Sequence, residues 1–227
     1  CYAKSGQSCS ITSPDIEKKG YTIIGWNTNK NATTSIWNIN TSKSISSSAT
    51  YYPILKANIY TITLNNQGAT SSGTKKVYYQ YNSSLTTCLS GGYNINKPSK
   101  TGYSFKGYYT STNGSGTNYV NSSGTFINNA YKTIGDKTLY ANWQANTYTI
   151  TYNANGGSGA PSSQSYTYDP NNDTVFYLSS TTPSRSGYTF LGWSLSSTAT
   201  SASYSAGQRW GTHNANNYIS YAVFCLT

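Results

Sequence analysis

A seven-residue block that occurs three times constrains this chain more than any other feature of its sequence. The copies are Gly20 to Trp26, Gly102 to Tyr108 and Gly187 to Trp193, and their successive tyrosines lie 82 and 85 residues apart. A fixed period is the signature of a tandem array. Each period is long enough to bury a modest core of its own. The spacing therefore predicts a series of small, similar domains.

Each block alternates as a β-strand does, so residues two apart share a face. We assign to the core the face that is large and apolar in all three copies. We assign the opposite face, which holds Trp193, to a partly wet surface. A glycine precedes the last aromatic residue of each block, and glycine within a strand is typical of a bulge or a close backbone approach. The predicted core face comprises Tyr21, Ile23, Tyr103, Phe105, Tyr188 and Phe190.

Two further segments repeat with the same order. Residues 55–63 match residues 143–151 at an offset of 88, and each joins a closing strand to an opening strand. The opening strands alternate threonine with aromatic and aliphatic residues, which is a strong strand signal. The first copy lacks such an opening strand. The predicted modules are an incomplete one at 1–57 and two further ones at 58–145 and 146–227.

These motifs resemble a known family. The opening segment 148–157, the block Gly187 to Trp193 and the closing segment 221–224 together resemble the Listeria–Bacteroides repeat, also called the B-repeat of internalin-type surface proteins. The second copy departs from the family pattern at the turn of residues 65–69 and at Tyr108, where tryptophan is usual.

The resemblance implies a mostly β fold. Each module would be a β-grasp (ubiquitin-like) unit, with a small antiparallel or mixed sheet and at most one short helix. The modules would form an elongated string. The family occurs in secreted and cell-surface bacterial proteins, where it serves in adhesion or as a stalk. It brings no catalytic residues with it.

The composition argues against an enzyme. Charged residues make up 9% of the chain, against about 25% in ordinary soluble domains. Acids are few, and His213 is the single histidine, so no catalytic group, cofactor or metal site is expected. Asp169 to Asp173 has the first oxygen spacings of a calcium loop, but Thr174 and Ser180 replace the glycine and glutamate such a loop needs. That segment therefore favours a turn.

Four cysteines and 15% aromatic residues indicate how such modules are stabilised. In an extracellular chain an even cysteine count favours disulfides, and three pairings are open. The short loop favours Cys1 with Cys9, which leaves Cys88 with Cys225. Exposed tryptophan and tyrosine side chains often form ligand-binding surfaces. A chain without methionine could equally use these residues to fill its hydrophobic cores. The candidate ligand-facing aromatics are Trp26, Trp37, Trp193 and Trp210.

The net charge of +10 comes from scattered lysines and arginines. No nucleic-acid motif accompanies them, so we expect weak, salt-screened attraction to anionic cell-surface polymers rather than nucleic-acid binding. No apolar run is long enough to insert into a membrane. Other protein chains and surface glycans are the remaining partner classes, and self-assembly is a further one.

Two functions follow from these patterns. The first is an extracellular, non-catalytic stalk or adhesin segment that presents or makes cell-surface contacts. The alternative is a subunit of an extracellular filament, in which another chain completes the first module by donating a strand to its open sheet edge. Residue 1 is Cys rather than Met, which favours a processed chain or a fragment.

Overall fold

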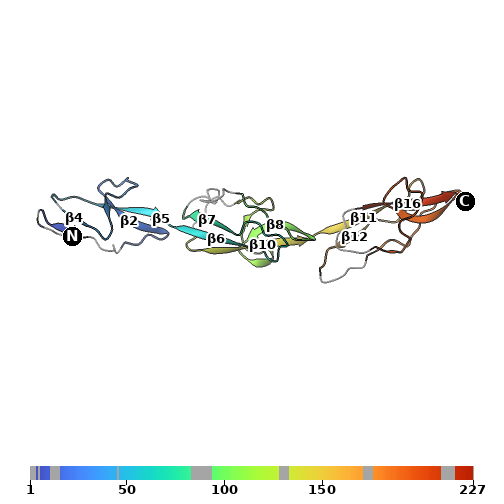
Figure 1. The fold of residues 1–227 in the computed structure, drawn as a ribbon, viewed down its shortest axis with the longest axis horizontal. Helices are drawn as coiled ribbons and strands as arrows, with labels where there is room; N and C mark the ends of the chain where they lie inside the picture. Colours follow the sequence, from blue (N-terminus) through green and yellow to red (C-terminus); the bar gives the residue numbers. More distant parts are fainter. Residues whose placement is uncertain are drawn as a thin grey trace. The chain divides into compact units, whose positions relative to one another are not determined.

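The computed structural model describes residues 4, 6–10, 16–44, 46–82, 94–127, 133–170, 176–210 and 218–226. In the last segment it describes the backbone and the side chains of Ala222 and Phe224. Almost all regular structure in these ranges is β (Figure 1). Within them the only helical element is the short 3-10 turn η1, Thr112–Gly114. The prediction of a mostly β chain with small antiparallel and mixed sheets is confirmed.

By its internal contacts the chain forms two compact units. One contains Cys1–Pro98 and Lys106–Asn142, and the other contains Ser99–Phe105 and Trp143–Thr227. The strands β8 (Tyr103–Tyr109) and β10 (Lys137–Ala145) each pass from one unit into the other.

The second repeat holds a five-stranded sheet in the order β7-β6-β10-β8-β9 (Figure 1). Its first strand β6 (Ile59–Asn65) lies parallel to its last strand β10, with Ile62 opposite Lys137. β7 (Lys76–Gln80) runs antiparallel to β6, and β9 (Asn118–Val120) runs antiparallel to β8.

The third repeat gives the same order over four strands, β12-β11-β16-β14. β11 (Thr147–Asn153) pairs in parallel with β16 (Tyr218–Leu226), and Ile150 lies opposite Tyr218. β12 (Gln164–Thr167) and β14 (Tyr188–Ser194) are the antiparallel outer strands. A small separate pair joins β13 (Phe176–Tyr177) to β15 (Arg209–Trp210).

In the first repeat the sheet order is β3-β2-β5, so the closing strand lies at an edge. β2 (Tyr21–Asn27) pairs antiparallel with β3 (Trp37–Asn38) and with β5 (Tyr52–Ala57). Within the described residues β5 has no parallel neighbour, whereas β10 and β16 each have one. A second pair joins β1 (Ser8–Ser10) to β4 (Ser42–Ser44).

A bulge at the repeated glycine decides which side chains are buried. The ladder register shifts between Phe190 and Gly192, and likewise between Ile23 and Gly25. At Gly192 (φ +147°) a Cβ would overlap the carbonyl oxygen of Tyr204 on the neighbouring segment, so only glycine permits the approach. The extra residue reverses the alternation beyond it.

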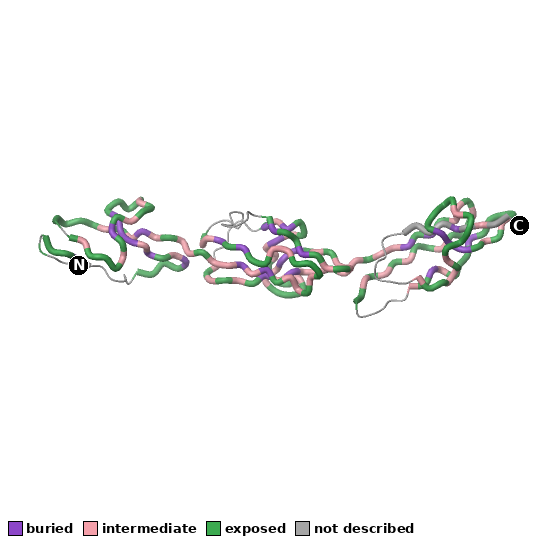
Figure 2. The backbone as a smooth tube through the Cα atoms, viewed as in Figure 1, coloured by how far each residue is buried: buried purple, intermediate pink, exposed green. Residues whose placement is uncertain are grey.

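This reversal corrects the predicted faces. Trp193 is 0% exposed and lies in the third core rather than on a wet surface. Of the six residues assigned to the core face, Ile23 is buried and the other five are half-buried. Phe190 packs against the core cluster of the third repeat, and buried residues lie within the largest sheet of each repeat (Figure 2).

The turn after the opening strand has the same backbone conformation in the second and third repeats, although its sequence in the second repeat departs from the family pattern. Asn155 and Gly156 have φ of +48° and +86°, and Gln67 and Gly68 have +49° and +71°. In the third repeat the backbone N–H of Asn155 donates to Asn153 Oδ1 at 2.7 Å. In the second repeat the backbone N–H of Gln67 donates to Asn65 Oδ1 at 3.0 Å. The side-chain change at Gln67 therefore leaves the local fold intact.

Candidate functional site

The residues that join one repeat to the next form a repeated cluster, which we call the tyrosine junction. In its first copy Tyr81, at the end of β7, packs edge-on against Tyr21, with ring centroids 5.4 Å apart and planes at 86°. Lys18 places its Nζ 4.6 Å from the centroid of the Tyr21 ring. Asn58, between β5 and β6, accepts a backbone hydrogen bond from Tyr81 N at 2.7 Å and donates to Gly20 O at 2.9 Å.

The second copy repeats this geometry almost atom for atom. Tyr168 packs edge-on against Tyr103, with centroids 5.3 Å apart and planes at 82°. Lys100 lies over the Tyr103 ring at 4.6 Å. Asn146 donates to Gly102 O at 2.9 Å and accepts from Tyr168 N at 2.8 Å.

The asparagine side chain completes each junction. Thr22 Oγ1 donates to Asn58 Oδ1 at 2.6 Å, and Ser104 Oγ donates to Asn146 Oδ1 at the same distance. Each asparagine amide also donates to the hydroxyl of the tyrosine two residues later at 3.4 Å. Asparagine suits this position because one short side chain supplies both a donor and an acceptor.

A glycine in the left-handed region allows the covering tyrosine to approach. Gly20 has φ +78° and Gly102 has φ +76°. A Cβ on either residue would overlap the ring of Tyr81 or Tyr168, respectively. Glycine is needed twice over, for the positive φ and for the space the ring fills.

The third copy of the block has the same glycine without a covering ring. Gly187 has φ +75°, and no described atom lies within 4 Å of the position its Cβ would take. The Arg185 guanidinium lies 4.2 Å from the centroid of the Tyr188 ring, where the other copies have lysine. Gly187 is exposed, whereas Gly102 is half-buried and Gly20 is buried.

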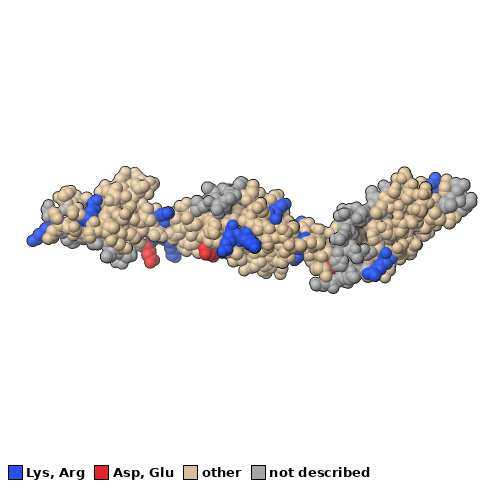
Figure 3. Space-filling model, in the orientation of Figure 1, with Lys and Arg blue, Asp and Glu red and all other residues tan. Residues whose placement is uncertain are grey.

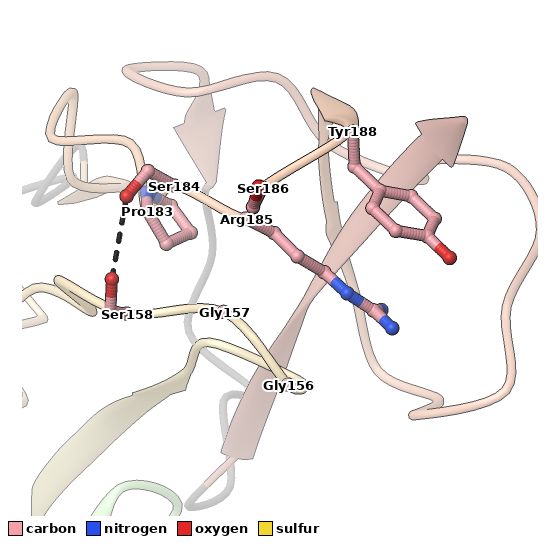
Figure 4. Close-up of a pocket in the computed structure, with 8 residues that line it drawn as sticks. All are labelled: Gly156, Gly157, Ser158, Pro183, Ser184, Arg185, Ser186 and Tyr188. Carbon is pink, nitrogen blue, oxygen red and sulfur yellow. Dashed lines mark hydrogen bonds between the residues drawn. The ribbon is translucent and has the colours of Figure 1, made fainter. Parts of the chain in front are cut away.

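Beside this uncovered copy lies an open depression of about 730 Å³ (Figure 4). Its floor is fixed by the turn after β11, where Ser158 and Ser184 exchange backbone hydrogen bonds at 2.8 and 2.9 Å. The Arg185 side chain extends from the far wall beside the Tyr188 ring (Figure 4). The described residues that line the depression are Gly156, Gly157, Ser158, Pro183, Ser184, Arg185, Ser186 and Tyr188.

This lining favours contact rather than chemistry. It offers an aromatic ring, one cation, hydroxyls and backbone groups, and its described members include no acid, histidine or cysteine. A nucleophile needs an oriented base beside it, and the lining does not supply one. Across the described residues no group of three His, Cys, Asp or Glu side chains is placed to hold a metal ion.

The candidate ligand-facing tryptophans take different places from those predicted. Trp26, Trp37 and Trp193 are 9%, 5% and 0% exposed, so their rings lie in the cores and offer little surface to a ligand. Trp210 is half-buried and stacks on Tyr204, with centroids 4.9 Å apart and planes at 14°. Large aromatic residues serve as core material here, because the chain has no methionine and few phenylalanines.

The cysteine predictions can be followed at one position. Cys9 is 3% exposed, lies in a core cluster with Trp26 and Trp37, and is disulfide-bonded. Cys1 and Cys88 lie outside the described residues, as does the side chain of Cys225. The pairing therefore stays a prediction. His213 and residues 171–175 of the acidic turn also lie outside the described residues.

Burial changes the acidity of two tyrosines in the second repeat. Burial, with smaller contributions from the neighbouring Tyr60 and Asp136, raises the pKa of Tyr79 to about 12. The Tyr79 hydroxyl donates to the backbone oxygens of Thr133 and Gly135 at 2.8 and 3.1 Å. Burial likewise raises the pKa of Tyr108. Both hydroxyls are structural donors that stay protonated at ordinary pH.

The described basic side chains are spread over the face drawn in Figure 3. On the face drawn in Figure 3, lysines and arginines stand apart, with uncharged surface between them. None of the described helices is long and apolar enough to span a bilayer.

Sequence reasoning missed the covering tyrosines of the junctions. Asn58 and Asn146 were part of the matched segments, but Tyr81 and Tyr168 follow them by 23 and 22 residues in poorly matched sequence. A tyrosine at nearly constant distance after each asparagine was the available signal.

Comparison with known proteins identifies the family to which these repeats are similar. The Listeria-Bacteroides repeat domain matches residues 3–53, 60–142 and 148–222. Two similar proteins of Evansella cellulosilytica carry the provisional names Gly-rich membrane protein and membrane protein. The first is 30% identical over 81% of this chain and 18% of its own length. The second is 28% identical over 94% of this chain and 30% of its own length.

The chain thus spans less than a third of the length of either relative. No solved structure matches it significantly. Three successive matches that together cover most of the residues show that the chain belongs to the Listeria–Bacteroides repeat family.

Proposed function

We propose that this chain is a segment of an extracellular bacterial surface protein, in which non-catalytic β repeats are coupled through tyrosine junctions into a stalk. The observation that carries the proposal is the recurrence of one junction. Gly20 and Gly102 are covered by a tyrosine of the following repeat in the same geometry. The repeat family and the membrane-protein names of two relatives support a surface location.

The junction suits a spacer because it restricts the hinge between repeats. A single connecting asparagine makes backbone and side-chain hydrogen bonds to both sides. Each such bond contributes about 0.5–1.5 kcal/mol to a folded arrangement, and an aromatic pair adds about 0.5–1.5 kcal/mol. We propose that the stalk holds other parts of the full protein away from the cell. Its exposed cations would meet anionic surface polymers, and its exposed aromatics would meet glycans or other protein chains.

We also propose that each repeat is a β-grasp module. The order β7-β6-β10-β8-β9, with a parallel pair of first and last strands at its centre, is the order of a β-grasp sheet and supports this assignment. The four-stranded sheet of the third repeat agrees with it as far as it extends. The boundaries 1–57, 58–145 and 146–227 belong to the same proposal.

The coupling is tested by ¹⁵N relaxation of the full chain. Coupled repeats tumble as one elongated body, so amides of all three repeats share a long rotational correlation time. Replacing Tyr168→Ala should shorten it for the third repeat, whereas Tyr177→Ala, which removes an exposed ring, should not. Independent tumbling of the repeats in the unchanged chain contradicts the stalk. Surface location is tested by brief trypsin treatment of intact producing cells, which should release peptides of this chain.

A second candidate function rests on the edge strand of the first repeat. β5 has no parallel neighbour among the described residues, whereas β10 and β16 do. An unpaired edge can accept a strand from another chain, which would build a filament. Electron microscopy of the purified chain tests it. Long fibres support strand donation, and discrete short particles at all concentrations contradict it.

A further inference from the structure

The block of the third repeat has arginine in place of lysine, and no described ring lies over its glycine. Gly187, Tyr188 and Arg185 reproduce the glycine, the ring and the cation of the two formed junctions. In those junctions the space above the glycine is filled by Tyr81 or Tyr168. We propose that Gly187 and Tyr188 form a docking site for a further repeat module, which covers Gly187 with a tyrosine ring. This inference rests on the proposed stalk and names the partner of one of its surfaces.

The backbone of Gly187 is already set for this partner. Its φ of +75° lies within a few degrees of the +78° and +76° of Gly20 and Gly102. A left-handed glycine followed by an extended strand leaves the face above the Cα open. With no described atom within 4 Å of the Cβ position, a ring can reach Gly187 as it reaches the other two glycines.

The strand register places the connecting residue as well. Tyr21 lies opposite Ala57 and is followed across the ladder by the connector Asn58. Tyr188 lies opposite Leu226, and the next residue in the sequence is Thr227. Threonine offers a hydroxyl in place of the amide. Thr189 occupies the sequence position of Thr22, whose hydroxyl donates to the side chain of the first connector, Asn58. The third site therefore has the glycine, ring and cation of the others, with threonine at the sequence position of the connecting asparagine.

Arg185 takes the place that Lys18 and Lys100 have in the two formed junctions. Its guanidinium lies over the Tyr188 ring at 4.2 Å and within 5.9 Å of the Phe224 centroid. The same group lies near the turn of Gly156, whose Cβ position would be 3.5 Å from Arg185 Cζ. A second copy of this chain is a poorer partner, because its Tyr81 and Tyr168 already cover its own Gly20 and Gly102.

The test extends the full chain by one module from its own sequence. Residues 59–145 are appended after Thr227, which supplies a second copy of Tyr81 at the distance found in the first junction. Glycine Hα resonances are then compared by NMR, because a ring above a glycine shifts its Hα signals upfield. Gly20 and Gly102 report formed junctions within the same molecule. Gly159, at φ +75° with no described atom within 4 Å of a Cβ, reports an uncovered glycine.

We expect the Gly187 Hα signals of the extended chain to move from the range of Gly159 to that of Gly20 and Gly102. Changing the appended Tyr81→Ala should return them, and Thr227→Asn should complete the shift if it is partial. Gly187 signals that stay with Gly159 in both the extended chain and its Thr227→Asn form overturn the docking site. Persisting upfield shifts at Gly20 and Gly102 would leave the proposed stalk intact in that case.

A second measurement separates docking of a module from self-association. The unextended chain is diluted about 100-fold while the Gly187 signals are followed, since association depends on concentration by mass action. Constant signals support a module as the occupant. A concentration-dependent upfield shift, abolished by Tyr81→Ala in the same chain, would show that a second copy fills the site and would overturn the proposal.

Discussion

In the second repeat the aromatic ring that follows the repeated glycine belongs to Tyr108, and in the third repeat it belongs to Trp193. Both side chains are fully buried. The Tyr108 hydroxyl donates to Asn66 Oδ1, whereas Trp193 Nε1 is buried with no hydrogen-bond partner among the described residues. The glycine before each ring fixes where the ring goes, and the ring then takes the partners that its own repeat offers. Backbone geometry is thus held in common while the side chains differ.

The largest test of this comparison removes the third ring. Trp193→Ala should destabilise the third repeat by about 3–5 kcal/mol, because a fully buried aromatic side chain leaves a cavity. Denaturant unfolding followed by amide signals of the third repeat measures the loss. Leu191→Ala, two residues away and 45% exposed, is the control, with an expected change of about 0.5 kcal/mol or less. Equal losses would refute the core position of Trp193.

The next test asks whether the two repeated glycines are equivalent. Gly192→Ala and Gly107→Ala should each cost about 1–3 kcal/mol, because both place a non-glycine residue at positive φ against a carbonyl oxygen of the neighbouring segment. Chemical denaturation of each repeat gives the two values. A Gly107 variant as stable as the unchanged protein would break the comparison, because Tyr108 would then be buried without the glycine.

A smaller effect isolates the covering tyrosine. Gly102 and Gly187 share nearly the same φ, so alanine at either position brings the same backbone strain. Gly102→Ala should cost about 1 kcal/mol more, because its methyl group also overlaps the Tyr168 ring. Thermal and chemical unfolding of the two variants measures the difference. Equal costs would mean that the ring above Gly102 contributes nothing to folding.

The smallest effect appears only in alkali. The pKa of Tyr79 is raised to about 12 in the folded second repeat, whereas an unfolded tyrosine titrates near 10. Below pH 10 both states hold the proton and stability is unaffected. Between pH 10 and 12 the unfolded state loses it first, so the free energy of unfolding falls as pH rises. Tyr79→Phe should flatten this fall, measured by unfolding at fixed pH values. An unchanged slope would show that Tyr79 does not carry it.

The sequence predicted the fold wherever local pattern determines it. Threonine and aromatic residues alternate from Thr147 onward, and a strand forms there. The recurring glycines predicted bulges, and the register shifts at Gly25 and Gly192 confirm them. The prediction that Trp193 lies on a partly wet surface was wrong. It continued the alternation of strand faces past Gly192, whereas the bulge there reverses that alternation.

The junctions needed long-range information. Tyr103 and Tyr168 are 65 residues apart in sequence, and their contact depends on where β11 and β12 place the second ring. A repeat marks both residues as recurring without indicating that they meet. The same limit applies to Tyr108 and Asn66, since the acceptor lies in a turn after another strand.

The parallel pairing of the first and last strands determines how the second and third repeats respond to a pulling force along the chain. The chain enters at the start of β11 and leaves at the end of β16, and these two strands lie side by side. Tension applied at these two ends slides one strand along the other. The load then falls on all their shared hydrogen bonds at once, whereas pulling apart the ends of an antiparallel hairpin opens its bonds one after another. A repeat built in this way resists stretching along the chain better than its modest core alone would suggest.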